Sequence, residues 1–106
     1  MDMQEIQKMV MDQARAKGFG TSPEDIIVAE KIALLHTELS EAYEAYRHKN
    51  MDGKHGFTEE LGDVMQRLLH LAGIFGVDLE QAIVEKIEAN KTREWKGINE
   101  RLGTPE

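Results

Sequence analysis

Residues 27–46, IVAEKIALLHTELSEAYEAY, place apolar side chains three to four positions apart along the whole segment. This period is typical of a helix with one face against a core. Six residues share the face that is predicted to be buried: Val28, Ile32, Leu35, Leu39, Ala42 and Tyr46. The stripe beside it consists of Ile27, Lys31, Leu34, Glu38, Glu41 and Ala45. The segment therefore predicts a long amphipathic helix with two carboxylates next to its apolar face.

A second acidic pair, Glu60 and Asp63, follows the first pair after 18 intervening residues. These two residues share a helical face with Val64, Leu71 and Ile74, so they also interrupt an apolar stripe. On a helix, positions three apart are neighbours, with Cβ atoms about 5–6 Å apart. Each pair can therefore direct two carboxylates toward one point.

The two acidic pairs are predicted to meet in one cage that holds a cation. Residues 49–56 contain two glycines and no apolar period, so we expect a loop that makes the flanking helices antiparallel. Glu41 lies about two turns before this loop, and Glu60 and Asp63 lie in the first two turns after it. The alternative is a solvated acidic face in which Asp63 forms an ion pair with Arg67.

Two helices are expected in the first half of the chain. The first covers about residues 3–17, because Asp2 and Glu5 resemble a capping box and Gly18 is a stop signal. The second is expected to begin at residues 22–25, where Ser-Pro-Glu-Asp combines a cap, a proline and early acids. It is expected to continue to about His48.

Two further helices are expected in the second half. Thr58 is predicted to cap the third helix, which ends at Gly76. Asp78, with Gln81 three residues later, predicts a fourth helix that runs to about Glu94. Residues 97–106 form a polar tail. Trp95 is expected to pack against the core, and the alternative is that it stacks on a base. No alternating strand pattern occurs, so the sequence predicts an all-α fold of four helices in one domain spanning residues 1–106.

Composition narrows the possible functions. The 106 residues are 41% hydrophobic and 6% aromatic, which predicts one helical domain with a modest core that a partner chain would help to bury. A net charge of −7 argues against binding a nucleic acid polymer, which requires clustered Lys and Arg. Cysteine is absent, and the sequence has neither a signal-peptide pattern nor an apolar stretch of about 20 residues. We therefore expect a cytoplasmic protein that does not bind a membrane.

The carboxylates favour a hard divalent cation. With no Cys and no Glu-x-x-His motif, oxygen ligands suit Mg²⁺, or Mn²⁺, better than zinc, copper or a di-iron centre. Mg²⁺ commonly completes its shell with substrate phosphates, so phosphate chemistry is expected. Lys86, Asn90 and Arg93 share one face of the fourth helix and are candidate substrate-binding residues. The alternative is that Lys86 and Arg93 are ordinary surface charges near a helix C-terminus.

Three motifs resemble the all-α nucleoside triphosphate pyrophosphohydrolases of the MazG type. They are LHTELSEA at residues 35–42, EELGDV at residues 59–64 and KIEAN at residues 86–90. The resemblance covers residues 24–95 and implies a four-helix bundle assembled as a homodimer or a dimer of dimers. It also implies that Mg²⁺ is held by the matching residues, which are Glu38, Glu41, Glu60 and Asp63. Lys86 and Asn90 are then expected to contact nucleotide phosphate or sugar.

The implied reaction is hydrolysis of an NTP or dNTP to the monophosphate and pyrophosphate, with a role in nucleotide-pool cleaning. Glu38 or Glu41 is expected to position or deprotonate the attacking water, and the sequence leaves this choice open. One alternative is a phosphoribosyl-ATP pyrophosphohydrolase, whose acidic motifs are related. Another is a non-catalytic helical module whose acids bind a basic partner. The sequence alone sets neither the base nor the sugar.

Overall fold

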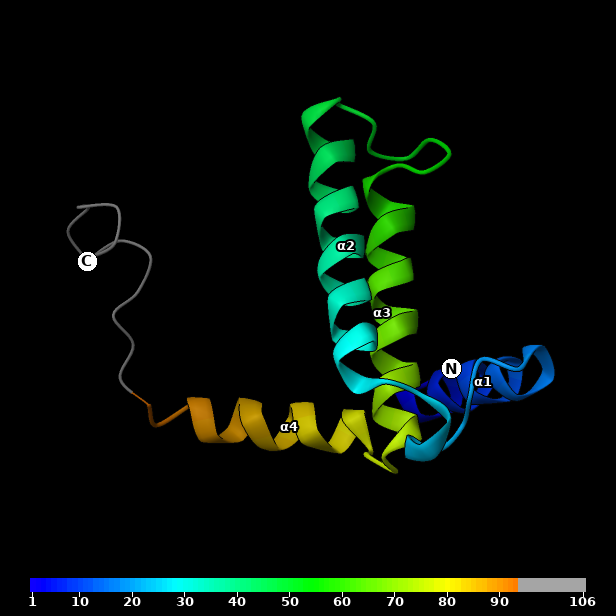
Figure 1. Cartoon of the computed structure of the whole chain (residues 1–106). Helices are drawn as coiled ribbons and strands as arrows, with labels where there is room; N and C mark the ends of the chain where they lie inside the picture. The colour runs from blue at the N-terminus through cyan, green and yellow to red at the C-terminus, as the bar shows by residue number, and fades with distance from the viewer. Residues whose placement is uncertain (94–106) are drawn as a thin grey trace.

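The computed structural model describes residues 1–93 and is helical, with no strand in that range. Its elements in chain order are α1 (Met3–Lys17), the 3₁₀ helix η1 (Pro23–Asp25), α2 (Val28–Arg47), α3 (Phe57–Ile74) and α4 (Leu79–Asn90). The expected all-α fold is therefore confirmed for the described residues. Helices α2 and α3 lie side by side as an antiparallel hairpin, and α1 packs across the end of α3 far from the hairpin loop (Figure 1). Helix α4 extends away from the hairpin.

The first helix agrees with its expected bounds because both of its caps form. The Asp2 carboxylate accepts a hydrogen bond from the backbone N–H of Glu5 at 2.8 Å. At the other end Gly18 adopts a φ of 74°, the left-handed conformation that favours glycine, and its N–H bonds to the Ala14 carbonyl. The sequence signals at the two ends therefore predicted both bounds of this helix.

The expected start of the second helix was wrong. Residues 23–25 form only the short 3₁₀ helix, and Ile26 and Ile27 are extended before α2 begins at Val28. The cause is the Asp25 carboxylate, which accepts hydrogen bonds from the Thr21 N–H at 3.3 Å and the Ser22 hydroxyl at 3.1 Å. These bonds close a local turn that competes with helix propagation. The Ser-Pro-Glu-Asp signal therefore marks a turn, not the start of α2.

The bounds of the third and fourth helices also differ from the prediction in part. The N-cap of α3 is Gly56 and not Thr58, which is the second residue of the helix. The Thr58 hydroxyl donates to the Asp52 carboxylate in the loop, at 3.0 Å, and does not cap the helix. Asp78 caps α4 as expected and accepts from the Gln81 N–H at 3.1 Å. Helix α4 ends at Asn90. The predicted end at about Glu94 was therefore wrong, because residues 91–93 form a turn. The predictions for Trp95 and residues 97–106 lie outside the described residues.

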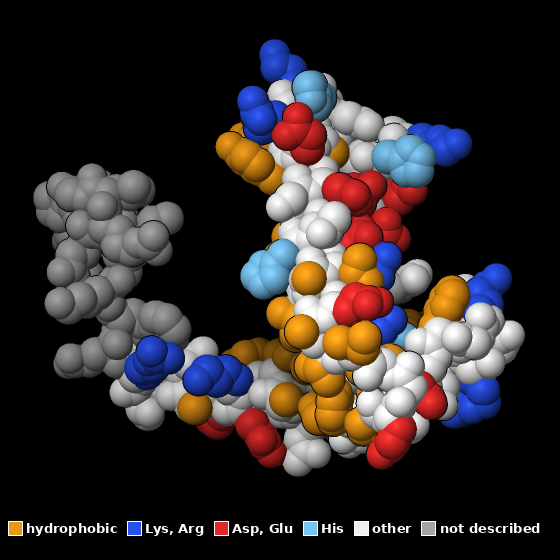
Figure 2. Space-filling model, in the orientation of Figure 1, with side chains coloured by type: hydrophobic (Ala, Val, Ile, Leu, Met, Phe, Trp, Pro, Cys, Tyr) orange, Lys and Arg blue, Asp and Glu red, His pale blue; other side chains and the backbone are white. Residues whose placement is uncertain are grey.

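The core of the described chain is small. The buried apolar residues are Ala14, Ala42, Ala45, Leu69 and Ile74, and no large side chain there is fully enclosed. Most of the α2 stripe that was expected to be buried is open to solvent, with Val28 43% and Leu39 51% exposed. Figure 2 shows the exposed apolar side chains around the lower half of the hairpin and on α4.

This exposure has a simple cause. Helix α4, which could have covered the hairpin, projects from its end and packs only lightly against α1 (Figure 1). The prediction of a buried α2 face is therefore wrong within the described chain, although Ala42 in that stripe is buried. No helix within residues 1–93 combines the length and the apolar character needed to cross a membrane.

Candidate metal centre

The loop between α2 and α3 sets the register that brings the acidic residues together. Asn50 organises it, because its side-chain oxygen accepts from the Gly53 N–H at 3.0 Å and its amide donates to the Lys54 carbonyl at 3.1 Å. The Asn50 carbonyl also accepts from the N–H of Phe57, the first residue of α3, at 2.9 Å. A Cβ on Gly56 would lie 2.8 Å from the Asn50 side-chain oxygen, so only glycine fits at this N-cap without a shift. The loop thus fixes where α3 begins relative to α2.

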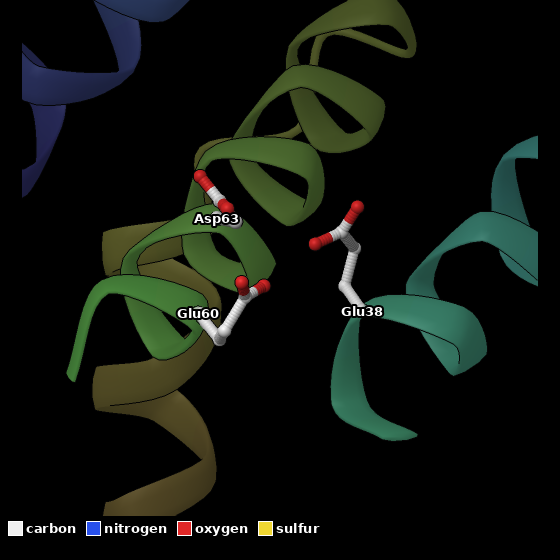
Figure 3. A group of neighbouring side chains, drawn as sticks. All are labelled: Glu38, Glu60 and Asp63. Carbon is white, nitrogen blue, oxygen red and sulfur yellow. The ribbon is translucent and has the colours of Figure 1, made fainter. Parts of the chain in front are cut away.

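Three carboxylates from the two helices converge beside one another (Figure 3). Glu38 projects from α2 toward Glu60 and Asp63 on α3, and one oxygen of each lies within 4.8 Å of the others. Glu60 is only 6% exposed, and the side chain of Glu38 is 12% exposed. We call these three residues the acidic triad. As expected, acidic residues of the two helices lie at the same level of the hairpin.

Within residues 1–93, Glu60 has a buried carboxylate oxygen without a hydrogen-bond partner. Its Oε2 is shielded from solvent and accepts no hydrogen bond in the described structure. Burial raises the pKa of the Glu60 carboxyl above its ordinary value, and the negative charges of Asp63, Glu41 and Glu38 raise it further. An unpartnered buried carboxylate is costly, so the site favours a proton or a cation at this position.

Arg67 neutralises one side of the acidic triad. Its Nε donates to Oε1 of Glu38 at 3.0 Å, across the α2–α3 interface. The alternative, an ion pair between Arg67 and Asp63, is therefore wrong, because Arg67 pairs with Glu38. Because Arg67 is bound to Glu38, it leaves Glu60 without a compensating partner.

The remaining predicted site residues lie apart from the acidic triad. Glu41 is exposed and outside the group, although it lies close enough for its charge to act on Glu60. Lys86 and Arg93 are exposed on and just after α4, and Asn90 is partly buried at the end of that helix. Helix α4 points away from the acidic triad (Figure 1), so the described chain does not bring these three residues to it. Their roles remain predictions.

Sequence reasoning did not anticipate a cavity beside the acidic triad. It has a volume of about 320 Å³, and Glu38 and Asp63 form part of its wall. The other side comes from α1 and from Phe19, which lies between two glycines with positive φ, Gly18 and Gly20. The sequence feature that could have indicated this cavity is an aromatic residue between two glycines at the end of a helix. We call this space the α1 cavity.

The donor set of the acidic triad fits a hard divalent cation. Three carboxylates supply only oxygen ligands, and no described residue adds sulfur or imidazole to the group. The orphaned Oε2 of Glu60 supplies the independent reason to expect a ligand. Searches for a matching protein-family model, a similar curated protein and a similar solved structure found none.

Removing Arg67 is expected to strengthen metal binding. In Arg67→Met, Glu38 loses the cation that competes with a metal, so the Kd for Mg²⁺ without nucleotide should fall roughly 1.5- to 5-fold. This range corresponds to about 0.2–1 kcal/mol for a partly exposed ion pair. Isothermal titration with MgCl₂ measures it. The matched control is Arg47→Met, which removes an arginine paired with Glu44 at 3.3 Å on α2, outside the acidic triad. Equal Mg²⁺ affinity in both variants would contradict competition at Glu38.

Proposed function

We propose that the protein is a Mg²⁺-dependent nucleotide pyrophosphohydrolase that cleaves an NTP or dNTP to the monophosphate and pyrophosphate. Mn²⁺ is the alternative metal. The observation that carries the proposal is Glu60, a 6% exposed carboxylate with an unpartnered oxygen inside a group of three acids. The resemblance of the three sequence motifs to MazG-type enzymes supports the same reaction. A negatively charged protein can bind a negatively charged nucleotide when a cation lies between them.

Glu38, Glu60 and Asp63 would hold the metal. When bound, Mg²⁺ would polarise phosphoryl oxygens and neutralise charge on the leaving pyrophosphate. Because Glu41 is exposed and lies outside the acidic triad, its carboxylate is open to water while the other three bind the cation. We therefore favour Glu41 over Glu38 as the residue that positions the attacking water.

Hydrolysis would take place at the α-phosphorus of the nucleotide. The water oxygen forms a new bond to the α-phosphorus, and the bond from that phosphorus to the α,β-bridging oxygen breaks. Pyrophosphate leaves with the bridging oxygen, and the water proton passes to the carboxylate of the first acidic pair. Lys86, Asn90 and Arg93 remain candidates for binding phosphate or sugar. They could do so once α4 packs near an acidic triad, as it would in the bundle that we propose for a homodimer or a dimer of dimers.

Product analysis tests the reaction directly. With 5 mM MgCl₂ and a panel of eight canonical NTPs and dNTPs plus phosphoribosyl-ATP, we expect monophosphate and pyrophosphate in equal amounts, and no turnover with EDTA. Ion-exchange chromatography separates the products. Orthophosphate with a diphosphate product would contradict the proposal. Turnover of phosphoribosyl-ATP alone would instead assign the related histidine-pathway reaction. No turnover and no Mg²⁺ effect on the melting temperature would favour a non-catalytic helical module.

A further inference from the structure

The α1 cavity is continuous with the candidate metal centre. Glu38 and Asp63 belong both to the acidic triad and to the cavity wall. A ligand whose phosphates bind at the acidic triad would therefore extend its remaining part into this space. The volume of about 320 Å³ is at the lower end of the roughly 300–1,000 Å³ typical of small-molecule sites. It is suited to one compact group, such as a base with its sugar.

Phe19 provides a flat apolar wall that is held in place. Its side chain is 52% exposed, although its backbone is anchored at both sides. The Phe19 N–H bonds to the Ala14 carbonyl at 2.9 Å, and the carbonyl of Gly20 accepts from His70 Nε2 at 2.8 Å. Because a carbonyl can only accept, His70 carries its proton on Nε2 in this contact. An exposed aromatic ring on an anchored segment is suited to stacking on a planar ligand.

Two glutamines and one lysine of the cavity wall are available to a ligand. Gln13 on α1 and Gln66 on α3 line it, and neither side-chain amide has a hydrogen-bond partner within residues 1–93. Each amide offers both a donor and an acceptor, as the edge of a nucleobase requires. Lys31, two helical turns before Glu38 on α2, also lines the cavity with no ion-pair partner in the described chain. It places a positive charge beside the acidic wall.

We propose that the α1 cavity binds the base and sugar of the nucleotide whose phosphates occupy the acidic triad. Phe19 stacks on the base, Gln13 and Gln66 bind its edge, and Lys31 contacts the phosphate or sugar. His70 is a positioning residue that holds the segment carrying Phe19. This inference rests on the proposed function and deepens it, because it assigns base recognition to α1 and its following turn. That part of the chain lies before the two acidic pairs.

The test compares ligands with and without a base. Mg²⁺-loaded full-length protein is titrated calorimetrically with non-hydrolysable α,β-imido dNTPs and, separately, with inorganic tripolyphosphate. Phe19→Ala should weaken binding of every dNTP analogue by roughly 5- to 150-fold, the effect of losing one base–aromatic stack. Its affinity for tripolyphosphate should not change, because that ligand has no base. Phe19→Trp should restore the binding of the analogues.

Two further variants sharpen the result. Phe75→Ala is the matched control, because Phe75 is 48% exposed and does not line the cavity, and it should bind all ligands as wild type does. Gln66→Ala should change the preference among the four bases by roughly 2- to 13-fold, as expected for one lost hydrogen bond. Wild-type binding of the analogues by Phe19→Ala, or an equal loss of tripolyphosphate, would overturn the assignment. If wild type hydrolyses nucleotides and Phe19→Ala is unaffected, only the cavity assignment fails; absent turnover in wild type rejects the proposed function itself.

Discussion

Glu60→Gln is expected to eliminate Mg²⁺-dependent turnover and, in the metal-free protein at pH 8, to raise the free energy of unfolding. Glutamine keeps the shape of the side chain but removes a charge that has no partner in the fold. Loss of a direct ligand should lower kcat/KM by more than about 100-fold, since even residues that only support metal ligands cost 10–100-fold. The new amide N–H groups can donate to the neighbouring carboxylates of Glu38 and Asp63.

The sign of the stability change follows from the raised pKa of Glu60 in the folded state. The folded protein retains this proton more strongly than the unfolded chain does, so its stability falls as pH rises from the unfolded pKa through the folded pKa. Above both values Glu60 is charged at a cost, and Glu60→Gln removes that cost. Below both values the group is neutral in either state, so the stability advantage of the variant should disappear. Urea unfolding in EDTA at pH 4 and pH 8 measures this difference.

Glu59→Gln is the matched control for Glu60→Gln. It removes the same charge from the neighbouring position of α3, where the side chain is 50% exposed and pairs with His55. It should leave turnover, Mg²⁺ binding and the pH dependence of stability close to those of wild type. In Mg²⁺ at 100 times its Kd, wild type should gain about 2.7 kcal/mol of stability, and Glu60→Gln should lose most of this gain. If Glu60→Gln melts well below wild type without metal and still hydrolyses nucleotide, the acidic triad has a structural role only.

Of the four acidic residues that helical periodicity predicted to converge, the structure brings three together. Residues three apart on a helix differ in direction by about 60°. Glu60 and Asp63 can both contribute because the Glu38 side chain points toward the two of them from α2 (Figure 3). On α2 the same 60° leaves Glu41 at the exposed edge. Sequence spacing therefore identified candidate ligands, but the helix–helix contact decided which of them converge.

Other features depended on contacts that no local pattern encodes. The start of α2 was missed because Asp25 bonds back to Thr21 and Ser22. The α1 cavity requires α1 to pack on α3, and Gln7 fixes this contact by donating to the carbonyls of Leu69 in α3 and of Val77 just after it. Apolar periodicity identifies which face of a helix is apolar, but not which element covers it. This is why the α2 face was expected to be buried and is exposed in the described chain.

The exposed α2 face predicts self-association, and Ile32→Lys is expected to abolish it. Along one side of α2, Val28, Ile32, Leu39, Tyr43 and Tyr46 are each more than 40% exposed. A stripe of this extent on a small chain marks an interface. Ile32 is 41% exposed, and in a twofold-symmetric dimer it contributes twice, so losing its newly buried surface costs about 1–2.5 kcal/mol, or about one to two orders of magnitude in Kd. The lysine ammonium would in addition have to be desolvated in the interface. Lysine changes the net charge of the chain only from −7 to −6, so dissociation could not be attributed to a larger net charge.

Sedimentation equilibrium at micromolar concentration measures the effect. Wild type should have at least twice the mass of a 12.0 kDa chain, and Ile32→Lys should sediment as a single chain. Ile32 is 41% exposed, so the substitution should change the fold of one chain little, which helical circular dichroism checks. Ile6→Lys is the control, since Ile6 is 39% exposed but lies on α1, outside the α2 stripe, and this variant should remain associated. A monomeric wild type would contradict the prediction. Association retained by Ile32→Lys would place the interface elsewhere, with the apolar residues Ile83, Val84 and Ile87 of α4 as the next face to substitute.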